Sequence, residues 1–139
     1  MPDSPSPVLD ICDLSLAFRL DSGLMTAVDG VSLKLFPGQT LGLVGESGSG
    51  KSVTAASILG LLPMPPAEVV AGQIWFRDGV GTDAAPIDLL TLTGDRLRNI
   101  RGGQIAMIFQ EPMSALNPVY TCGFQLVEAI QLHQTVTKK

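Results

Sequence analysis

The stretch Gly45-Glu46-Ser47-Gly48-Ser49-Gly50-Lys51-Ser52 decides the fold class of this chain. It matches the pattern G-x-x-x-x-G-K-[ST], for which residue frequencies predict a chance match in such a chain on the order of one per cent. An apolar run, Thr40–Val44, precedes the stretch, and a helix-forming run, Lys51–Leu62, follows it. A buried strand, a glycine-rich loop and a helix in this order are typical of a P-loop in an α/β protein.

The residue types of this loop predict phosphate binding. Glycines let successive backbone N–H groups turn inward around an anion, and the helix that follows adds its positive end. The Lys51 ammonium is expected to reach the β- and γ-phosphates, and the Ser52 hydroxyl to ligate Mg²⁺. The Glu46 carboxylate is expected to point to solvent, because a negative charge beside a phosphate is unfavourable. The residues predicted to hold the nucleotide are Gly45, Glu46, Ser47, Gly48, Ser49, Gly50, Lys51, Ser52 and Val53. The alternative is a Gly/Ser turn that only joins a strand to a helix.

The composition narrows the function classes. The chain has 139 residues, a net charge of -4 and 16% charged residues, whereas soluble domains average about 25%. Without a block of Lys and Arg, general nucleic-acid binding is not expected. No apolar stretch approaches the roughly 20 residues that span a bilayer, and Met1–Pro7 lacks the features of a secretion signal, so we expect an intracellular protein. Cys12 and Cys122 lie too far apart for a CxxC motif and are expected to be two buried free thiols.

The hydrophobic pattern predicts alternating strands and helices after a flexible arm at Met1–Pro7. Short helices and strands are separated by segments rich in Gly and Pro. The expected strands are Val8–Phe18, Ala27–Phe36, Thr40–Val44, Gly72–Arg77 and Gln104–Phe109, with a turn at Arg19–Thr26 and a surface loop at Asp78–Pro86. The expected helices are Lys51–Leu62, a short one that starts near Thr93, and one within Tyr120–Gln134.

A second informative stretch is Met107-Ile108-Phe109-Gln110-Glu111-Pro112-Met113-Ser114-Ala115-Leu116-Asn117-Pro118. A buried strand here delivers Gln110 at its carboxyl end, where ligands bind in open α/β sheets. A glutamine side chain can accept and donate hydrogen bonds, which suits holding a metal-bound water. Without the phosphate loop, an ordinary strand-to-helix turn would explain the same residues.

Together, the phosphate loop, its spacing to Gln110 and the string Met107–Pro118 resemble the ATP-binding subunit of an ABC transporter. Within that superfamily they resemble the dipeptide/oligopeptide (and nickel) importer group. The segment Ala27–Leu33 before Pro37-Gly38 and the pair Arg101-Gly102 also fit, and the resemblance runs from about Val8 to His133. It implies an α/β fold with a partial P-loop NTPase core of the ABC ATPase type and an N-terminal antiparallel β-subdomain. Residues 8–139 would be the N-terminal part of the ATP-binding domain.

The resemblance also implies roles for individual residues. Gly45–Ser52 would be the Walker A loop, with Lys51 in a catalytic role and Ser52 as a metal ligand. Gln110 would be the Q-loop glutamine, which contacts Mg²⁺ and helps to place the attacking water. Glu111–Tyr120 would face the coupling helices of the membrane subunits. Phe18 lies where the family has an aromatic residue that stacks on adenine, although an apolar strand end explains it equally well. The resemblance also implies that Val28 packs beside the base.

The sequence also departs from the family pattern. Nothing in it resembles the LSGGQ signature, the Walker B strand or the switch histidine, and His133 on a candidate helix is not expected to fill that last role. We therefore expect the chain alone to bind MgATP without efficient hydrolysis. The implied partners are transmembrane permease subunits and a second ATP-binding subunit, at the cytoplasmic face of the inner membrane. The alternatives are a non-catalytic nucleotide-binding fragment and another P-loop enzyme, such as a kinase or GTPase. The transported solute is not predicted.

Overall fold

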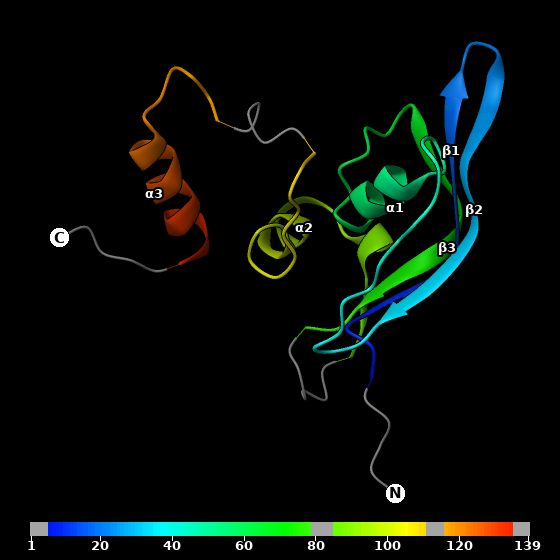
Figure 1. The fold of residues 1–139 in the computed structure, drawn as a ribbon, viewed down its shortest axis with the longest axis horizontal. Helices are drawn as coiled ribbons and strands as arrows, with labels where there is room; N and C mark the ends of the chain where they lie inside the picture. The colour runs from blue at the N-terminus through cyan, green and yellow to red at the C-terminus, as the bar shows by residue number, and fades with distance from the viewer. Residues whose placement is uncertain (1–5, 79–84, 111–115, 135–139) are drawn as a thin grey trace, which may run out of the picture. The chain divides into compact units, whose positions relative to one another are not determined.

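The computed structural model describes residues 6–78, 85–110 and 116–134 of the chain (Figure 1). They belong to two compact units, Met1–Leu97 and Arg98–Lys139, and each is described by itself. Most of the predicted arm, part of the predicted surface loop and the residues 111–115 lie outside the described ranges. None of the helices within those ranges is both long and apolar enough to cross a membrane.

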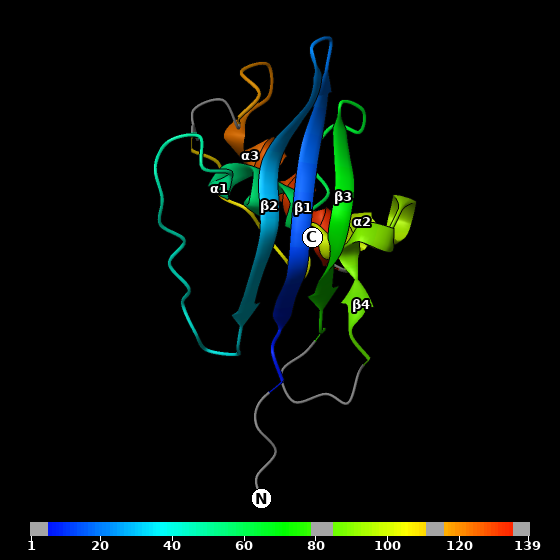
Figure 2. The ribbon, with the colours of Figure 1, turned by 90° about the vertical axis from the view of Figure 1, so that its right-hand side faces the viewer.

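The first unit is built on an antiparallel sheet. Its strands are β1 (Leu9–Leu20), β2 (Gly23–Leu35), β3 (Ala67–Phe76) and the two-residue β4 (Ile87–Asp88). Figure 2 shows them in the order β2-β1-β3-β4, so that the first strand in the sequence lies in the middle of the sheet. The expected N-terminal antiparallel sheet is therefore confirmed.

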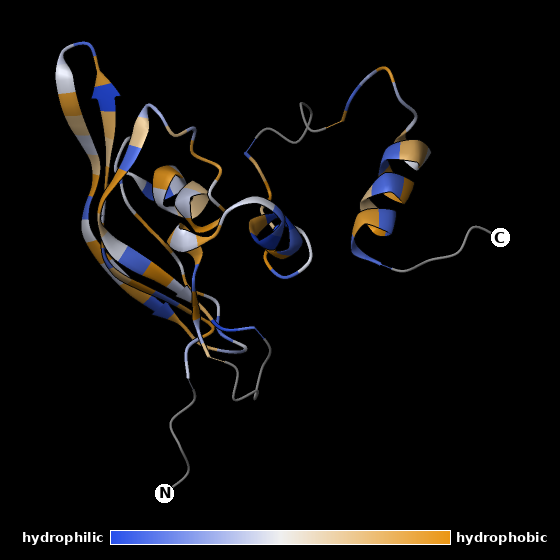
Figure 3. Cartoon of the chain, turned by 180° about the vertical axis from the view of Figure 1, so that it is seen from behind, coloured by the Kyte–Doolittle hydropathy of each residue, from blue (hydrophilic) through white to orange (hydrophobic). Residues whose placement is uncertain are grey.

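The core of this unit lies on one face of the sheet. The strands alternate apolar and polar residues, visible as orange and blue bands in Figure 3, because successive side chains point to opposite faces. The largest fully buried side chains of the sheet are Ile11, Leu14, Leu16 and Ile74. Burial of each stabilises the fold by about 1.5–3 kcal/mol. The helix α1 (Lys51–Ile58) contacts β2, and the 3₁₀ turn η1 (Leu89–Thr91) contacts β3 and α1.

The remaining helices agree in type with the sequence pattern. The helix α2 (Gly94–Ile100) begins one residue after Thr93, as expected. The helix α3 (Cys122–His133) in the second unit begins at an N-cap, Thr121, whose hydroxyl accepts a hydrogen bond from the Phe124 N–H. Such a cap satisfies a donor that the first helical turn leaves unpaired. The helix expected over Lys51–Leu62 ends earlier, at Ile58.

Two predicted buried strands are wrong. Thr40–Val44 is an irregular, exposed segment in which Val44 is 95% exposed. Over Gln104–Phe109 there is only one isolated parallel bridge, between Arg101 and Ile105, and Ile108 is 94% exposed. A parallel strand needs hydrogen-bonding neighbours. Neither run pairs with a strand within residues 6–78, 85–110 and 116–134.

Two other boundaries also differ from the expectation. The turn expected over Arg19–Thr26 is much tighter, because Leu20 already pairs with Gly23 across the β1–β2 hairpin. Long cross-strand pairing extends both strands into the predicted turn. The strand expected to begin at Gly72 begins at Ala67 instead, because that segment pairs with β1 over its whole length.

Candidate functional site

The glycine-rich loop ends where α1 begins. Gly50 is the N-cap of α1 and has φ 86°, in the left-handed region that favours glycine. Its carbonyl oxygen accepts two hydrogen bonds from Thr54, from the N–H at 2.8 Å and from Oγ1 at 3.0 Å. Thr54 is buried, so this pairing satisfies its hydroxyl inside the unit. The loop and the first turn of α1 therefore form one locally determined structure.

Gly50 also packs against the sheet. A Cβ atom at this position would lie 2.5 Å from the carbonyl oxygen of Ala27 and 3.3 Å from Cγ2 of Val28, both on β2. Only a residue without a side chain can approach the backbone of a strand so closely. The contact positions the start of α1 against β2. It also puts Val28, which is buried, beside the end of the phosphate loop.

The Lys51 ammonium is folded against the loop that precedes it. Nζ donates hydrogen bonds to the carbonyl oxygens of Gly45 at 2.8 Å and Glu46 at 2.6 Å, and to Oγ of Ser49 at 3.0 Å. A Cβ on Gly45 would come within 2.7 Å of the same Ser49 oxygen. The loop is thus curled tightly around a single positive charge.

The donor set of the loop fits a phosphate group. It combines a helix N-terminus, a lysine held at the loop and the hydroxyl-bearing Ser52, which is exposed in the first turn of α1. Glu46 is exposed, and Val53 on the same turn as Ser52 is half-buried. A hydroxyl oxygen is a hard ligand that suits Mg²⁺. The residues present therefore suit a magnesium-bound nucleotide.

Phe18 lies on β1, opposite the part of β2 that Gly50 contacts. It is half-buried and stands opposite Met25 on β2 and Ala67 on β3. Met25 lies two residues before Ala27 on β2, and Gly50 packs against Ala27. The register of the sheet therefore brings the backbone of Phe18 to the same part of β2 as the end of the loop.

Comparison with known protein families finds a match over most of the chain. The profile of the family described as "ABC transporter" matches residues 28–137, which include the whole phosphate loop. The chain belongs to the ABC transporter family. This assigns it the P-loop NTPase fold expected from the sequence and separates it from P-loop kinases and GTPases.

Several bacterial relatives of this chain are named as ATP-binding proteins of transport systems. It is 51% identical over 131 residues to the peptidoglycan transport ATP-binding protein YejF of Agrobacterium fabrum, covering 94% of the chain and 22% of that protein. It is 46% identical over 132 residues to the dipeptide transport ATP-binding protein DppD of Bacillus subtilis, covering 95% of the chain and 37% of the relative. A putative peptide import ATP-binding protein of Brucella ovis is 43% identical over 136 residues, covering 98% and 39%. The chain thus spans less than two fifths of the length of each of these relatives.

Gln110, the predicted Q-loop residue, lies in the second unit of the ABC transporter chain. It is exposed and follows an irregular segment, residues 106–109. The residues 111–115 that follow it lie outside the described ranges. Its approach to the phosphate loop, which is in the first unit, stays a prediction.

The second unit also contains His133. This residue is exposed at the end of α3, and its imidazole packs against the turn at Gly102-Gly103. A Cβ on Gly102 would lie 2.5 Å from Nε2 of His133. The histidine thus fills space beside a glycine turn. No group of three or more His, Cys, Asp or Glu side chains suited to a metal occurs in the part of the chain that the structure describes.

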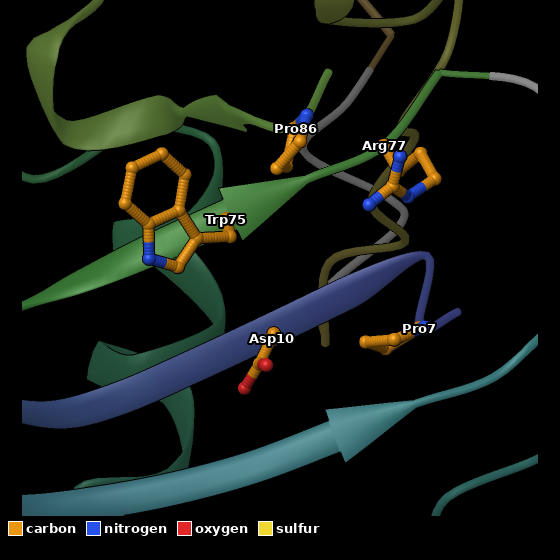
Figure 4. A pocket seen from close by; sticks show the side chains of 5 residues that line it. All are labelled: Pro7, Asp10, Trp75, Arg77 and Pro86. Atoms are coloured by element: carbon orange, nitrogen blue, oxygen red, sulfur yellow. The ribbon is translucent and has the colours of Figure 1, made fainter. Parts of the chain in front are cut away.

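A separate pocket lies on the sheet of the first unit. Figure 4 shows it between Trp75 and Asp10, with Pro7, Arg77 and Pro86 around it. Asp10 is already paired, since its carboxylate lies 3.1 Å from Nζ of Lys34. Lys34 is near the end of β2, whereas Ala27 contacts the phosphate loop nearer to the start of that strand. The pocket is therefore distinct from the loop.

Sequence reasoning missed the residues that fix the loop from outside it. The contact of Gly50 with Ala27 joins positions far apart in the sequence, so the loop motif itself carries no sign of it. Thr54 carries a weak local signal, because a threonine four positions after Gly50 can donate to its carbonyl oxygen inside a helix.

Proposed function

We propose that the Gly45–Ser52 loop binds the phosphates of MgATP and that the chain serves as the ATP-binding, energy-coupling component of an importer for peptides or related small solutes. One observation carries the nucleotide assignment. Gly50 opens α1 in a left-handed conformation against β2, while the Lys51 ammonium is held at the loop by three hydrogen bonds. The loop thus carries a positive charge next to the N-terminus of a helix, and both features favour binding of an anion such as phosphate.

Each residue of the proposed site has a separate role. Lys51 offsets charge on the β- and γ-phosphate oxygens, and the backbone N–H groups of the loop donate to the phosphates. Ser52 and Gln110 hold Mg²⁺, and Gln110 also positions the attacking water. When bound, Mg²⁺ supplies positive charge that stabilises the transferring phosphoryl group. Phe18 offers its ring to the adenine base.

The proposed organisation follows the family. Residues 8–139 form the N-terminal part of an ABC ATP-binding domain, with the Walker A loop, the Q-loop and the start of the helical subdomain. The 139 residues contain no match to the LSGGQ signature or to the Walker B strand. We therefore expect this chain by itself to bind MgATP without efficient hydrolysis.

The names of the relatives support the transport assignment. They are described as peptidoglycan transport, dipeptide transport and putative peptide import ATP-binding proteins. By analogy, the partners are transmembrane permease subunits, contacted through Glu111–Tyr120, and a second ATP-binding subunit. The complex would lie at the cytoplasmic face of the inner membrane, with this component peripheral to the bilayer.

Nucleotide binding by the Lys51→Ala variant tests the proposal. Removing the charge-assisted contacts should weaken MgATP binding roughly 10- to 100-fold, measured by calorimetry. The matched control is Lys34→Ala, which removes a lysine charge near the end of β2, away from the loop. Its MgATP affinity should be unchanged. Equal affinity of Lys51→Ala and the parent chain would overturn the assignment of the loop. Phosphate release by the purified chain at the rate of a complete ATPase would contradict the expected lack of hydrolysis.

A further inference from the structure

The side chain of Gln125 on α3 joins the helix to the turn that leads into it. Oε1 of Gln125 accepts a hydrogen bond from the Asn117 N–H at 2.8 Å. Nε2 donates to the carbonyl oxygens of Asn117 and Tyr120, both at 3.0 Å. One amide group therefore pairs with both backbone groups of Asn117 and with a third backbone group closer to the helix.

Other contacts complete this turn, and one weak ring contact joins it to the helix. Oδ1 of Asn117 accepts from the Val119 N–H at 3.0 Å, and the Tyr120 N–H donates to the Asn117 carbonyl oxygen at 3.3 Å. The Tyr120 ring stacks on the ring of Phe124 with centroids 5.2 Å apart. Both rings are about half exposed, so their stacking alone holds the turn weakly.

We propose that Gln125 is a positioning residue, whose amide group makes the Asn117–Tyr120 turn and α3 one rigid element. A turn of this kind, with exposed side chains and few buried contacts, would otherwise open locally at little cost. Three hydrogen bonds from one side chain remove that freedom, because opening the turn would have to break all of them together.

A rigid turn would also matter for the coupling of ATP binding to transport, and this consequence rests on the proposed function. Asn117–Tyr120 lies in the segment expected to contact the permease subunits, and this segment follows Gln110. If the turn and α3 move together, a displacement at the Gln110 end is passed to the helix. If the turn is loose, the same displacement is absorbed by the backbone of Pro118 and Val119.

Amide hydrogen exchange of the 139-residue chain tests the rigid element without nucleotide. In Gln125→Leu, which keeps the bulk of the side chain and removes the amide, exchange at Asn117 should accelerate about tenfold. In Gln125→Glu the acceptor for the Asn117 N–H remains and the Nε2 donor is lost, so the acceleration there should be smaller. Gln131→Leu, a matched change on the same helix, should leave Asn117 unaffected. Unchanged exchange at Asn117 in Gln125→Leu would overturn the proposal.

Exchange within α3 separates positioning from loss of the helix. Ala129 and Leu132 should exchange as in the parent chain in all three variants. If exchange at Ala129 and Leu132 accelerates in Gln125→Leu, that variant has lost helix, and Gln125→Glu is compared with the parent chain instead. Faster exchange at Asn117 in Gln125→Glu, with unchanged exchange at Ala129, supports the proposal. Equal exchange at Asn117 in these two proteins overturns it.

Transport by the assembled importer tests the consequence for coupling. In Gln125→Leu, the solute transported per ATP hydrolysed should fall several-fold while MgATP affinity stays unchanged. An unchanged ratio would overturn the role in coupling, whatever the exchange data show. Absence of MgATP binding by the parent chain would instead overturn the proposed function and leave the exchange result at Asn117 standing.

Discussion

Ser32 on β2 and Asp13 on β1 are joined by two hydrogen bonds that run in opposite directions. The Ser32 hydroxyl donates to Oδ1 of Asp13 at 3.0 Å, and Oγ of Ser32 accepts a hydrogen bond from the Asp13 N–H at 2.9 Å. Asp13 has φ 47°, uncommon for a residue other than glycine, and lies where the pairing of β1 with both neighbours shifts. The pair therefore fixes a bulge in the middle strand of the sheet.

Loss of the Ser32 hydroxyl should destabilise the sheet. In Ser32→Ala, the Asp13 N–H and carboxylate lose their partner, and because the site is exposed we expect a loss of about 0.5–1 kcal/mol in the free energy of unfolding. Urea denaturation measures the change, with Ser22→Ala in the adjacent hairpin turn as the control. A loss no larger than that of the control would mean that the bulge forms without this pair.

Gly72 on β3 lies opposite the same bulge and should tolerate no side chain. A Cβ there would lie 2.5 Å from Cα of Leu14 and 2.6 Å from the carbonyl oxygens of Asp13 and Cys12, all backbone atoms. We expect Gly72→Ala to cost more than about 3 kcal/mol of unfolding free energy. Gly30→Ala is the control, because Gly30 also has positive φ but nothing lies within 4 Å of its Cβ position. Similar losses in both variants would show that φ alone, and not the close approach, determines the cost.

The elements that could be predicted are those with a local pattern. Alternation in β1 and β2, a helix-forming run after Gly50, and the Thr121 cap of α3 each follow from neighbouring residues. Thr40–Val44 and Gln104–Phe109 were predicted wrongly, because an apolar run becomes a strand only where other strands offer hydrogen bonds. Strand ends such as Leu20 depend on cross-strand pairs in the same way.

In the candidate site, too, features set by neighbouring residues could be predicted, and contacts between distant segments could not. The helix that begins at the end of the Gly45–Ser52 loop could be predicted, because glycine and lysine positions within one short segment carry the information. Nucleotide binding by this loop stays a prediction. The contact between Gly50 and Ala27, and the clamp of Gln125 on Asn117, depend on how separate segments pack. Spacing in the sequence does not encode such contacts.

The close approach of Gly50 to β2 leads to a prediction for nucleotide affinity. In Gly50→Ala, the new methyl group would meet the Ala27 carbonyl oxygen at 2.5 Å, so the start of α1 must move away from the sheet. We expect MgATP affinity to fall at least about tenfold, because the loop N–H groups no longer converge. Gly42→Ala is the matched control, since nothing lies within 4 Å of a Cβ at that position. Retained affinity in Gly50→Ala would show that the loop does not need its contact with β2.

The two cysteines should differ in reactivity and in their response to pH. Burial raises the pKa of the Cys12 thiol, and the hydrogen bond to Asp10 together with the charge of that carboxylate raises it further. Cys122 is exposed. Because the thiolate is the reactive form, we expect Cys12 to react on the order of tenfold more slowly than Cys122 with a disulfide reagent at pH 8. The variants Cys12→Ser and Cys122→Ser each leave one thiol to measure.

The same shift sets a pH dependence of stability. The folded pKa of Cys12 lies above that of an unfolded thiol, about 8.5, so its contribution is fully present below that pH. As pH rises further, the unfolded chain releases the proton first, and the contribution is lost as the pH passes through the folded pKa. The stability difference between the parent chain and Cys12→Ser, measured by urea denaturation, should therefore be constant from pH 6 to about 8 and then shift against the parent.

Asp10→Asn removes the acceptor's charge and should lower the pKa of Cys12 and speed its reaction. Equal thiol reactivity in the Asp10→Asn variant and the parent would contradict the role of Asp10 in this shift.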